Sequence, residues 1–269
     1  IAEYYDYFAG LADKVEGTVV PIDKPDMQVT TTRIPIGVVA AIIPWNSQML
    51  LTAVKLAPAL AMGNTVVIKA SELAPVTLLE FAKLIEKTGI PKGVINIITG
   101  LGEPCGKALT THSLVERIAF TGGPETAKHI VKNSAENLSQ VSLELGGKSP
   151  VVVFDDADQE NALNGITAGI FGASGQSCIA GSRLYLQSSI YDEFLKKLIS
   201  KAEKIKLGGP MEKDTQMGPL NSFKQLENIE KNIKTTIEQG GKIRCGGKRS
   251  SISNKGYYFP ATIIECKNH

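Results

Sequence analysis

Short apolar runs alternate with helical patterns along most of the chain. The strand-like runs Gly37–Trp45, Thr65–Lys69 and Gly93–Thr99 are each followed by a segment of helical periodicity. These runs are apolar throughout, which is typical of parallel strands covered by helices on both faces. Right-handed crossovers then place the carboxyl ends of the strands, and the loops after them, at one ligand-binding edge. We therefore predict an α/β fold built on a parallel sheet.

The same alternation continues beyond a glycine pair, Gly146 and Gly147, which is the expected hinge between two α/β units. Pro58 lies inside one helical pattern and should kink or split that helix. Residues 18–35 form an extended stretch with alternating threonines, which predicts a hairpin. Helices are predicted at 1–16, Met49–Met62, Pro75–Thr88, Gly106–Thr111, Pro124–Asn137, Gln159–Phe171, Tyr191–Ile205 and Ser222–Gln239, and further strands at Arg117–Thr121, Gln140–Leu145, Pro150–Phe154, Arg183–Gln187 and Lys242–Cys245.

Composition and charge narrow the classes of function. The 269 residues are 43% hydrophobic and 21% charged, as in an ordinary globular protein, with a formal net charge of +2. Lys and Arg are dispersed, so neither nucleic acid nor an anionic membrane surface is an expected partner. No apolar run approaches the ~20 residues needed to span a bilayer. The four cysteines are widely spaced and histidines are few, so we expect no disulfide framework, no metal site and a reducing compartment, the cytoplasm.

The stretch Phe171–Arg183 places Cys178 in a bend rich in glycine and serine, between a helical pattern and a strand-like run. A cysteine on such a bend can expose its sulfur in a cleft where backbone N–H groups hold an oxyanion. A lone cysteine in a turn is more often a small packing residue. The residues upstream decide between these interpretations.

Polar and glycine residues lie where predicted strands end. Gly100, Gly102 and Gly106 follow one strand and open a short helix, so the backbone there can approach a phosphate. Their spacing differs from the dinucleotide fingerprint, and glycines also simply make turns. Lys69 and Glu72 offer a ribose one donor and one acceptor, or form a solvated ion pair.

Two further side chains suit acyl chemistry. The amide of Asn46, just after a strand, can donate to negative charge developing on oxygen, although asparagine also favours turns for its backbone geometry. Glu144 ends an apolar strand, and we expect it to enter a semi-buried site. Desolvation there would disfavour its ionised form, which suits a general base. The plain alternative is a strand-end glutamate that faces water.

Together these segments resemble the aldehyde dehydrogenase superfamily over nearly the whole chain. Glu144 in LELGGKSP and Cys178 in GQSC, 34 residues apart, form a highly specific pair. The resemblance implies a Rossmann-like NAD-binding domain at 36–146 and a second α/β catalytic domain at 147–269, both incomplete. Residues 1–17 would end a helix, and 18–35 would form a bridging hairpin used in oligomerisation. The matching motifs are PWN (Pro44–Asn46), GNTVVIKASE (Gly63–Glu72), PKGVINIITGLGEPCG (Pro91–Gly106), FTGG (Phe120–Gly123), LELGGKSP (Leu143–Pro150), GQSCIAGSR (Gly175–Arg183), GPL (218–220) and GYYFPATI (256–263).

The resemblance also implies a mechanism. Cys178 would attack the aldehyde carbon, Asn46 and the Cys178 backbone N–H would hold the oxyanion, and Glu144 would activate the water that hydrolyses the thioester. Lys55 resembles a family lysine in the proton path beside that glutamate. Glu72 would bind the adenosine ribose and repel a 2′-phosphate, so NAD is expected over NADP. The cofactor is expected at Ile42, Ile43, Trp45, Lys69, Glu72, Gly102, Gly106 and Gly123, and the aldehyde at Ser47, Gln48, Ser177 and Ile179.

Three positions depart from the family pattern. Gly123-Pro124 stands where Ser-Thr is usual, so main-chain N–H groups at a helix start would bind the pyrophosphate. Ala70 stands where proline is common. Ser47-Gln48 replaces the common Phe-Pro near the substrate entry, which suggests a pocket more polar than in enzymes for fatty or aromatic aldehydes.

Family members are about twice as long as this chain, and the resemblance implies that their intact forms are homodimers or homotetramers. A strand that pairs subunits, and a segment that contacts the nicotinamide ribose, lie outside these residues. We therefore expect the isolated chain to be inactive or poorly folded, and robust NAD reduction by it would contradict this. Two alternatives stay open: a CoA-acylating semialdehyde dehydrogenase, against which Glu144 argues, and a catalytically silent fragment of the fold.

Overall fold

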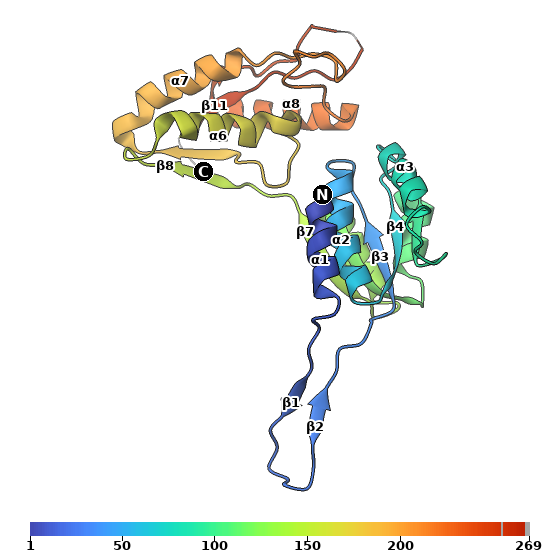
Figure 1. Cartoon of the computed structure of the whole chain (residues 1–269). Helices are drawn as coiled ribbons and strands as arrows, with labels where there is room; N and C mark the ends of the chain where they lie inside the picture. Colours follow the sequence, from blue (N-terminus) through green and yellow to red (C-terminus); the bar gives the residue numbers. More distant parts are fainter. Residues whose placement is uncertain (254, 267–269) are drawn as a thin grey trace. The chain divides into compact units, whose positions relative to one another are not determined.

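The computed structural model describes residues 1–253 and 255–266. The chain forms two compact units, Ile1–Leu145 (unit 1) and Gly146–His269 (unit 2). Each unit combines strands with helices, which confirms the predicted α/β class (Figure 1). The two units are described one at a time.

Unit 1 is built on a five-stranded sheet in the order β5–β4–β3–β6–β7, with all neighbouring strands parallel. The central strand β3 is buried on both faces, because its alternate residues enter two separate cores. This arrangement confirms the parallel sheet expected from the continuous apolar runs. The strands are β3 (Val38–Ile42), β4 (Thr65–Lys69), β5 (Ile95–Ile98), β6 (Val115–Gly122) and β7 (Gln140–Leu145).

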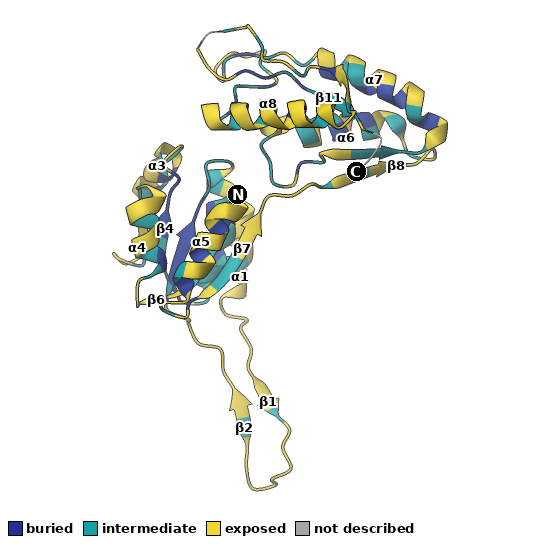
Figure 2. Ribbon diagram, turned by 180° about the vertical axis from the view of Figure 1, so that it is seen from behind, coloured by how far each residue is buried: buried dark blue, intermediate teal, exposed yellow. Residues whose placement is uncertain are grey.

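Helices cover both faces of this sheet, so its strands are buried between helices whose outer faces are exposed (Figure 2). On one face, α1 (Ala2–Leu11), α2 (Gln48–Ala61) and α3 (Val76–Ile85) pack against a core that includes Val39 and Ile68. On the other face, a second core joins the sheet to the turn-like helix α4 and to α5. These are α4 (Lys107–Thr110), preceded by the helical turn η1 (Gly102–Gly106), and α5 (Pro124–Ser134).

Pro58 was expected to kink or split its helix. It does not split it, because α2 runs unbroken from Gln48 to Ala61. A proline removes one N–H donor and crowds the carbonyl four residues earlier. Here Pro58 lies near the helix end, and its neighbours Leu56 and Ala57 are buried in the packed face. Burial of that face outweighs the lost hydrogen bond.

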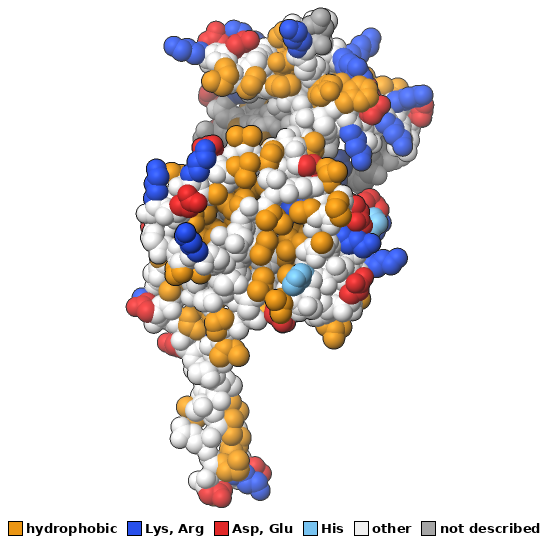
Figure 3. Space-filling model, turned by 90° about the vertical axis from the view of Figure 1, so that its right-hand side faces the viewer, with side chains coloured by type: hydrophobic (Ala, Val, Ile, Leu, Met, Phe, Trp, Pro, Cys, Tyr) orange, Lys and Arg blue, Asp and Glu red, His pale blue; other side chains and the backbone are white. Residues whose placement is uncertain are grey.

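Residues 18–35 contain the predicted hairpin, formed by β1 (Thr18–Val20) and β2 (Val29–Thr31) in antiparallel register. It extends away from the sheet of unit 1 (Figure 1). Its side chains are largely exposed, among them Val19 at 68% and Met27 at 59%, and hydrophobic side chains line one side of it (Figure 3). Among the described residues, β1 and β2 pair with each other alone, so both outer edges are open.

The described residues of unit 2 form two short two-stranded sheets, one parallel (β8–β9) and one antiparallel (β10–β11). Phe194, whose side chain is fully buried, lies in the core between the parallel pair and its helices. Asp158 begins α6 by accepting hydrogen bonds from two backbone N–H groups of the first turn. The elements are β8 (Pro150–Val153), α6 (Gln159–Phe171), η2 (Gly172–Gly175), β9 (Arg183–Leu186), η3 (Ser188–Ile190), α7 (Tyr191–Glu203), α8 (Phe223–Glu238), β10 (Lys242–Cys245) and β11 (Ile263–Glu265).

The open hairpin predicts self-association of the isolated chain through its strand edges. Val19→Lys should raise the fraction of monomer in size-exclusion chromatography, because a charge on an edge strand opposes pairing with another chain. Leu84→Lys is the matched control, since Leu84 is 57% exposed but lies on helix α3. Equal effects of the two substitutions would show that general hydrophobicity, rather than the strand edge, drives association.

Candidate active site

The carboxyl ends of the unit 1 strands bring several predicted residues to one edge of the sheet. Ile42 of β3 lies level with Lys69 of β4 on one side and with Phe120 of β6 on the other. On the next pair of strands, Thr121 lies level with Glu144. Loops that follow these strands therefore begin from a common edge, as expected for a ligand site in an open α/β sheet.

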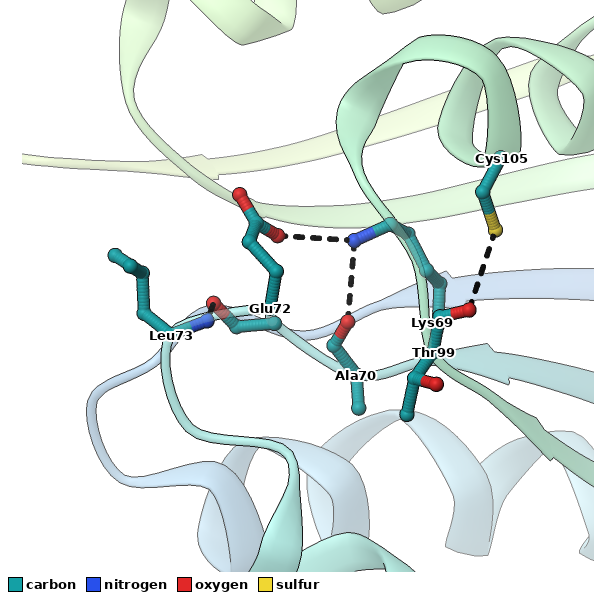
Figure 4. A network of polar contacts seen from close by, with 7 residues as sticks. Lys69, Ala70, Glu72, Leu73, Thr99 and Cys105 are labelled. Atoms are coloured by element: carbon teal, nitrogen blue, oxygen red, sulfur yellow. Dashed lines mark hydrogen bonds and ion pairs between the residues drawn. The ribbon is translucent and has the colours of Figure 1, made fainter.

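Lys69 and Glu72 form an ion pair at this edge (Figure 4). The Lys69 Nζ donates to the Glu72 carboxylate at 3.3 Å and to the Ala70 carbonyl at 3.1 Å. Lys69 is only 5% exposed, so these acceptors offset the cost of burying its charge. The Glu72 side chain is 43% exposed, which leaves its carboxylate accessible to a ligand.

The glycines after β5 leave open space beside this pair. A Cβ added at Gly102 would meet nothing within 4 Å, and one at Gly106 would make ordinary contacts with the Lys69 side chain, at 3.8 Å from Cε. Packing within the chain therefore does not explain glycine at these two positions. Close approach of a ligand is a sufficient reason.

Gly123 is the N-cap residue of α5, and no side chain caps that helix. Its first turn therefore presents backbone N–H groups and the positive end of the helix dipole, an arrangement that favours an anion. Pro124 at the first position supplies no N–H, so the donors lie further along the turn.

The segment after β3 turns sharply into α2. Trp45, Asn46 and Gln48 are half-buried, and Ser47 is exposed with a left-handed φ of 50°. The Gln48 side-chain amide donates to the Ala74 carbonyl at 3.3 Å, which ties the turn to the loop after β4.

Ile42 and Ile43 enter opposite cores of the sheet, and both side chains are buried. The backbone N–H of Ile43 donates to the Lys69 carbonyl at 3.0 Å. A ligand at this edge would therefore meet the main chain at Ile43 rather than its side chain.

Lys55 reaches from α2 to the sheet, where its Nζ donates to the Thr121 hydroxyl at 2.7 Å. Burial lowers the pKa of Lys55, and the negative charge of Glu144 opposes that shift. Glu144 itself is exposed on β7. The expected semi-buried position for this carboxylate therefore stays a prediction, because unit 1 by itself leaves the end of this edge strand exposed. Thr121 was not among the predicted site residues. Its position in the FTGG motif could have identified it.

In unit 2, Cys178 lies half-buried in the turn that follows η2. The preceding backbone is unusual, since Ala173 and Ser174 both have left-handed φ values, 51° and 55°. Two contacts with a later segment hold this bend. The Ser174 hydroxyl donates to the Gly218 carbonyl at 3.0 Å, and the Gln176 side chain accepts from the Asn221 N–H at 3.0 Å. Strained backbone of this kind concentrates at functional sites.

Ser177 and Ile179, on either side of Cys178, line a cavity of about 470 Å³ in unit 2. Its other walls include Val151 of β8 and the small residues Gly165 and Gly169 of α6. Ile179 is 81% exposed, so a large apolar side chain is available beside the cysteine. The cavity can receive a mainly apolar group.

Unit 1 thus gathers Lys69, Glu72 and Gly106 at one place, and Lys55 with Thr121 and Glu144 at another. Cys178 lies in unit 2, so its pairing with Glu144 or Asn46 stays a prediction. No group of three or more His, Cys, Asp or Glu among residues 1–253 and 255–266 could hold a metal ion. In the same residues, no helix has the length and apolar character to cross a membrane.

A sequence model of the aldehyde dehydrogenase family matches residues 1–269. The chain belongs to the aldehyde dehydrogenase family. It is 58% identical over 266 residues to (Z)-2-((N-methylformamido)methylene)-5-hydroxybutyrolactone dehydrogenase of Acinetobacter baylyi, covering 99% of this chain and 54% of that protein. It is 42% identical over 271 residues to betaine aldehyde dehydrogenase of Bacillus subtilis, covering 100% of this chain and 55% of the relative.

Solved aldehyde dehydrogenase structures have the same fold. The crystal structure of PnpE in complex with nicotinamide adenine dinucleotide aligns with a TM-score of 0.95 at 45% identity, over 98% of this chain and 55% of that one. Betaine aldehyde dehydrogenase of Staphylococcus aureus in complex with NAD⁺ aligns with a TM-score of 0.93 at 42% identity, over 97% and 52% of the two chains. The chain thus spans about half the length of the aldehyde dehydrogenases that it matches.

Proposed function

We propose that the whole protein oxidises an aldehyde to a carboxylic acid with NAD, through a thioester on Cys178. The observation that carries the proposal is the family match over residues 1–269, joined to Cys178 on a strained bend beside a cavity. Unit 1 is the NAD-binding part and unit 2 the catalytic part. The intact protein is proposed to be a cytoplasmic homodimer or homotetramer, with residues 18–35 in the subunit contact.

In this mechanism the Cys178 thiolate forms a bond to the aldehyde carbon. The Asn46 amide and the Cys178 backbone N–H donate to the oxygen that becomes negative. The chemistry that a bound NAD would supply here is that of an acceptor for the hydride of this carbon. Glu144 then takes a proton from water, the hydroxide adds to the thioester carbon, and the Cys178 thiolate leaves as the carboxylic acid forms. The acid and the protonated Glu144 then each lose a proton to solvent, which restores the base.

The residues at the sheet edge fit NAD. Gly102 and Gly106 leave room for the backbone to approach a phosphate, and the uncapped start of α5 suits the pyrophosphate. Lys69 and Glu72 supply a donor and an exposed acceptor for the adenosine ribose. Trp45 and the main chain of Ile42 and Ile43 complete the proposed site.

The aldehyde is proposed to lie against Ser47, Gln48, Ser177 and Ile179. The polar pair Ser47-Gln48 favours a polar aldehyde over a long alkyl one. A higher kcat/KM for decanal than for betaine aldehyde would contradict it.

A CoA-acylating enzyme is the second candidate, since the same thioester could pass its acyl group to CoA instead of water. Glu144, the proposed water activator, argues against it. Formation of free acid without CoA would support the hydrolytic enzyme. Formation of acyl-CoA as the sole product would instead support the CoA-acylating enzyme. A catalytically silent protein would show neither product, and NAD or aldehyde would not protect Cys178 from iodoacetamide at neutral pH.

Glu144→Gln in the whole protein should leave the first hydride transfer intact but stop turnover. We expect a burst of about one NADH per Cys178, followed by a steady state reduced about 100-fold or more, because the amide cannot accept the proton of water. Stopped-flow absorbance of NADH measures both phases. Glu116→Gln is the control, since Glu116 is exposed at the opposite end of strand β6. A normal steady state in Glu144→Gln would remove this residue from the mechanism, and Cys178→Ala should lose both phases.

Glu72 should set the preference between the two cofactors. The wild-type protein is expected to have a higher kcat/KM with NAD, and Glu72→Gln should narrow the NAD/NADP ratio about tenfold by removing the charge that repels a 2′-phosphate. Glu80→Gln, which changes an exposed glutamate of α3, should leave the ratio unchanged. Comparable kcat/KM values for NAD and NADP in the wild type would overturn the assignment.

A further inference from the structure

A buried threonine links the glycine turn after β5 to helix α5. Thr110 is the last residue of α4, and it is only 1% exposed. Its hydroxyl accepts a hydrogen bond from the side-chain amide of Asn133 at 2.9 Å. The same hydroxyl donates to the Gly106 carbonyl at 2.9 Å and to the Lys107 carbonyl at 3.1 Å. A chain of hydrogen bonds therefore runs from Asn133 of α5 through Thr110 to Gly106.

This chain of hydrogen bonds ends at a glycine of the candidate cofactor site. A Cβ added at Gly106 would lie 3.8 Å from Cε of Lys69, so the main chain of the turn lies close to that side chain. The N–H of Gly106 donates to the Leu101 carbonyl at 3.1 Å, which closes the turn. Both main-chain polar groups of Gly106 are thus held, and the bond to its carbonyl depends on Thr110.

Helix α4 is too short to fix this turn by itself. It has four residues, and a single helical turn is unstable in water without tertiary contacts. Helix α5 has eleven residues and is anchored in the core of unit 1 through Ala127 and Ile130. Asn133 lies on this anchored helix, so its bond to Thr110 transmits the position of α5 to the glycine turn.

We propose that Thr110 and Asn133 are positioning residues for NAD binding, because their contact holds the Gly106 turn in place beside Lys69 before the cofactor arrives. This inference rests on the proposed function, in which unit 1 binds NAD. Without the contact, part of the binding free energy would be used to order the turn, and the affinity would fall by that part. Neither side chain contacts the cofactor or the aldehyde in this proposal.

Two substitutions at Thr110 separate the hydroxyl from the shape of the side chain. Thr110→Val removes the hydroxyl and keeps the shape, whereas Thr110→Ser keeps the hydroxyl. The matched control is Thr111→Val, because the Thr111 hydroxyl donates to the Lys107 carbonyl at 3.0 Å and, among the described residues, makes no hydrogen bond to α5. In every variant the Asn137 side chain can still donate to the His112 carbonyl, a 2.8 Å bond that keeps the end of α4 attached.

We expect the Kd for NAD of the whole protein, measured by isothermal titration calorimetry, to rise about fivefold or more in Thr110→Val and in Asn133→Ala. Thr110→Ser and Thr111→Val should stay within about twofold of the wild type. The double variant Thr110→Val/Asn133→Ala should bind NAD no more than about twofold more weakly than the weaker single variant, because both changes remove one contact. Additive losses would show that the two residues act separately, which contradicts the proposal.

Steady-state kinetics distinguish positioning from a general loss of structure. In Thr110→Val the KM for NAD should rise by about the same factor as the Kd, while kcat at saturating NAD and KM for the aldehyde are not impaired. A variant that is only less stable would contain less active protein, so it would lower kcat and leave the KM for NAD unchanged. That second pattern would contradict the positioning role.

The last readout needs neither cofactor nor turnover. Amide hydrogen exchange of residues 100–107 in the free protein should be at least about fivefold faster in Thr110→Val and unchanged in Thr111→Val. Unchanged exchange in Thr110→Val, or an unchanged Kd in a protein whose wild type binds NAD, would overturn the inference alone. A wild type that does not bind NAD would instead overturn the proposed function, and the inference with it.

Discussion

The parallel register of the unit 1 sheet is the constraint on which the rest of the candidate site depends. Because β3, β4, β6 and β7 run in the same direction, the ends of all four strands deliver their polar residues to one edge. A slip of one residue between β6 and β7 would turn Glu144 to the opposite face from Thr121. The buried apolar residues of these strands determine which register is stable. They therefore determine the positions of the candidate site residues as well as the fold.

The proposed nucleophile, Cys178, follows a strained bend that contacts with a later segment of the chain hold in place. Ala173 and Ser174 adopt left-handed backbone that costs residues with side chains of order 1 kcal/mol or more each. The contacts of Ser174 with Gly218 and of Gln176 with Asn221 stabilise that conformation. The segment 218–221 therefore anchors the bend that carries Cys178, although it lies about 40 residues further along the chain.

Much of the fold follows from the sequence because its periodic signals are strong. The strands Thr65–Lys69, Gln140–Leu145 and Lys242–Cys245 and the helix Gln159–Phe171 have the bounds that their patterns predict. Local rules failed where tertiary packing decides, as at Pro58. The exposure of Glu144 depends on which parts of the protein cover the edge strand β7. The sequence pattern of a strand carries no information about this. The Lys55–Thr121 contact joins a helix to a strand 66 residues away, so motif matching alone does not reveal it.

The cavity beside Cys178 is lined by two residues without side chains, Gly165 and Gly169. A Cβ built at Gly165 or Gly169 would meet no atom within 4 Å, so each position could accept a methyl group without a clash. Glycine inside a helix is also less favourable than alanine by roughly 0.5–1 kcal/mol. The two glycines thus make helix α6 less stable than alanines would, and they leave space next to Cys178. A Gly165→Ala or Gly169→Ala substitution would therefore make this cavity smaller and raise the melting temperature at the same time.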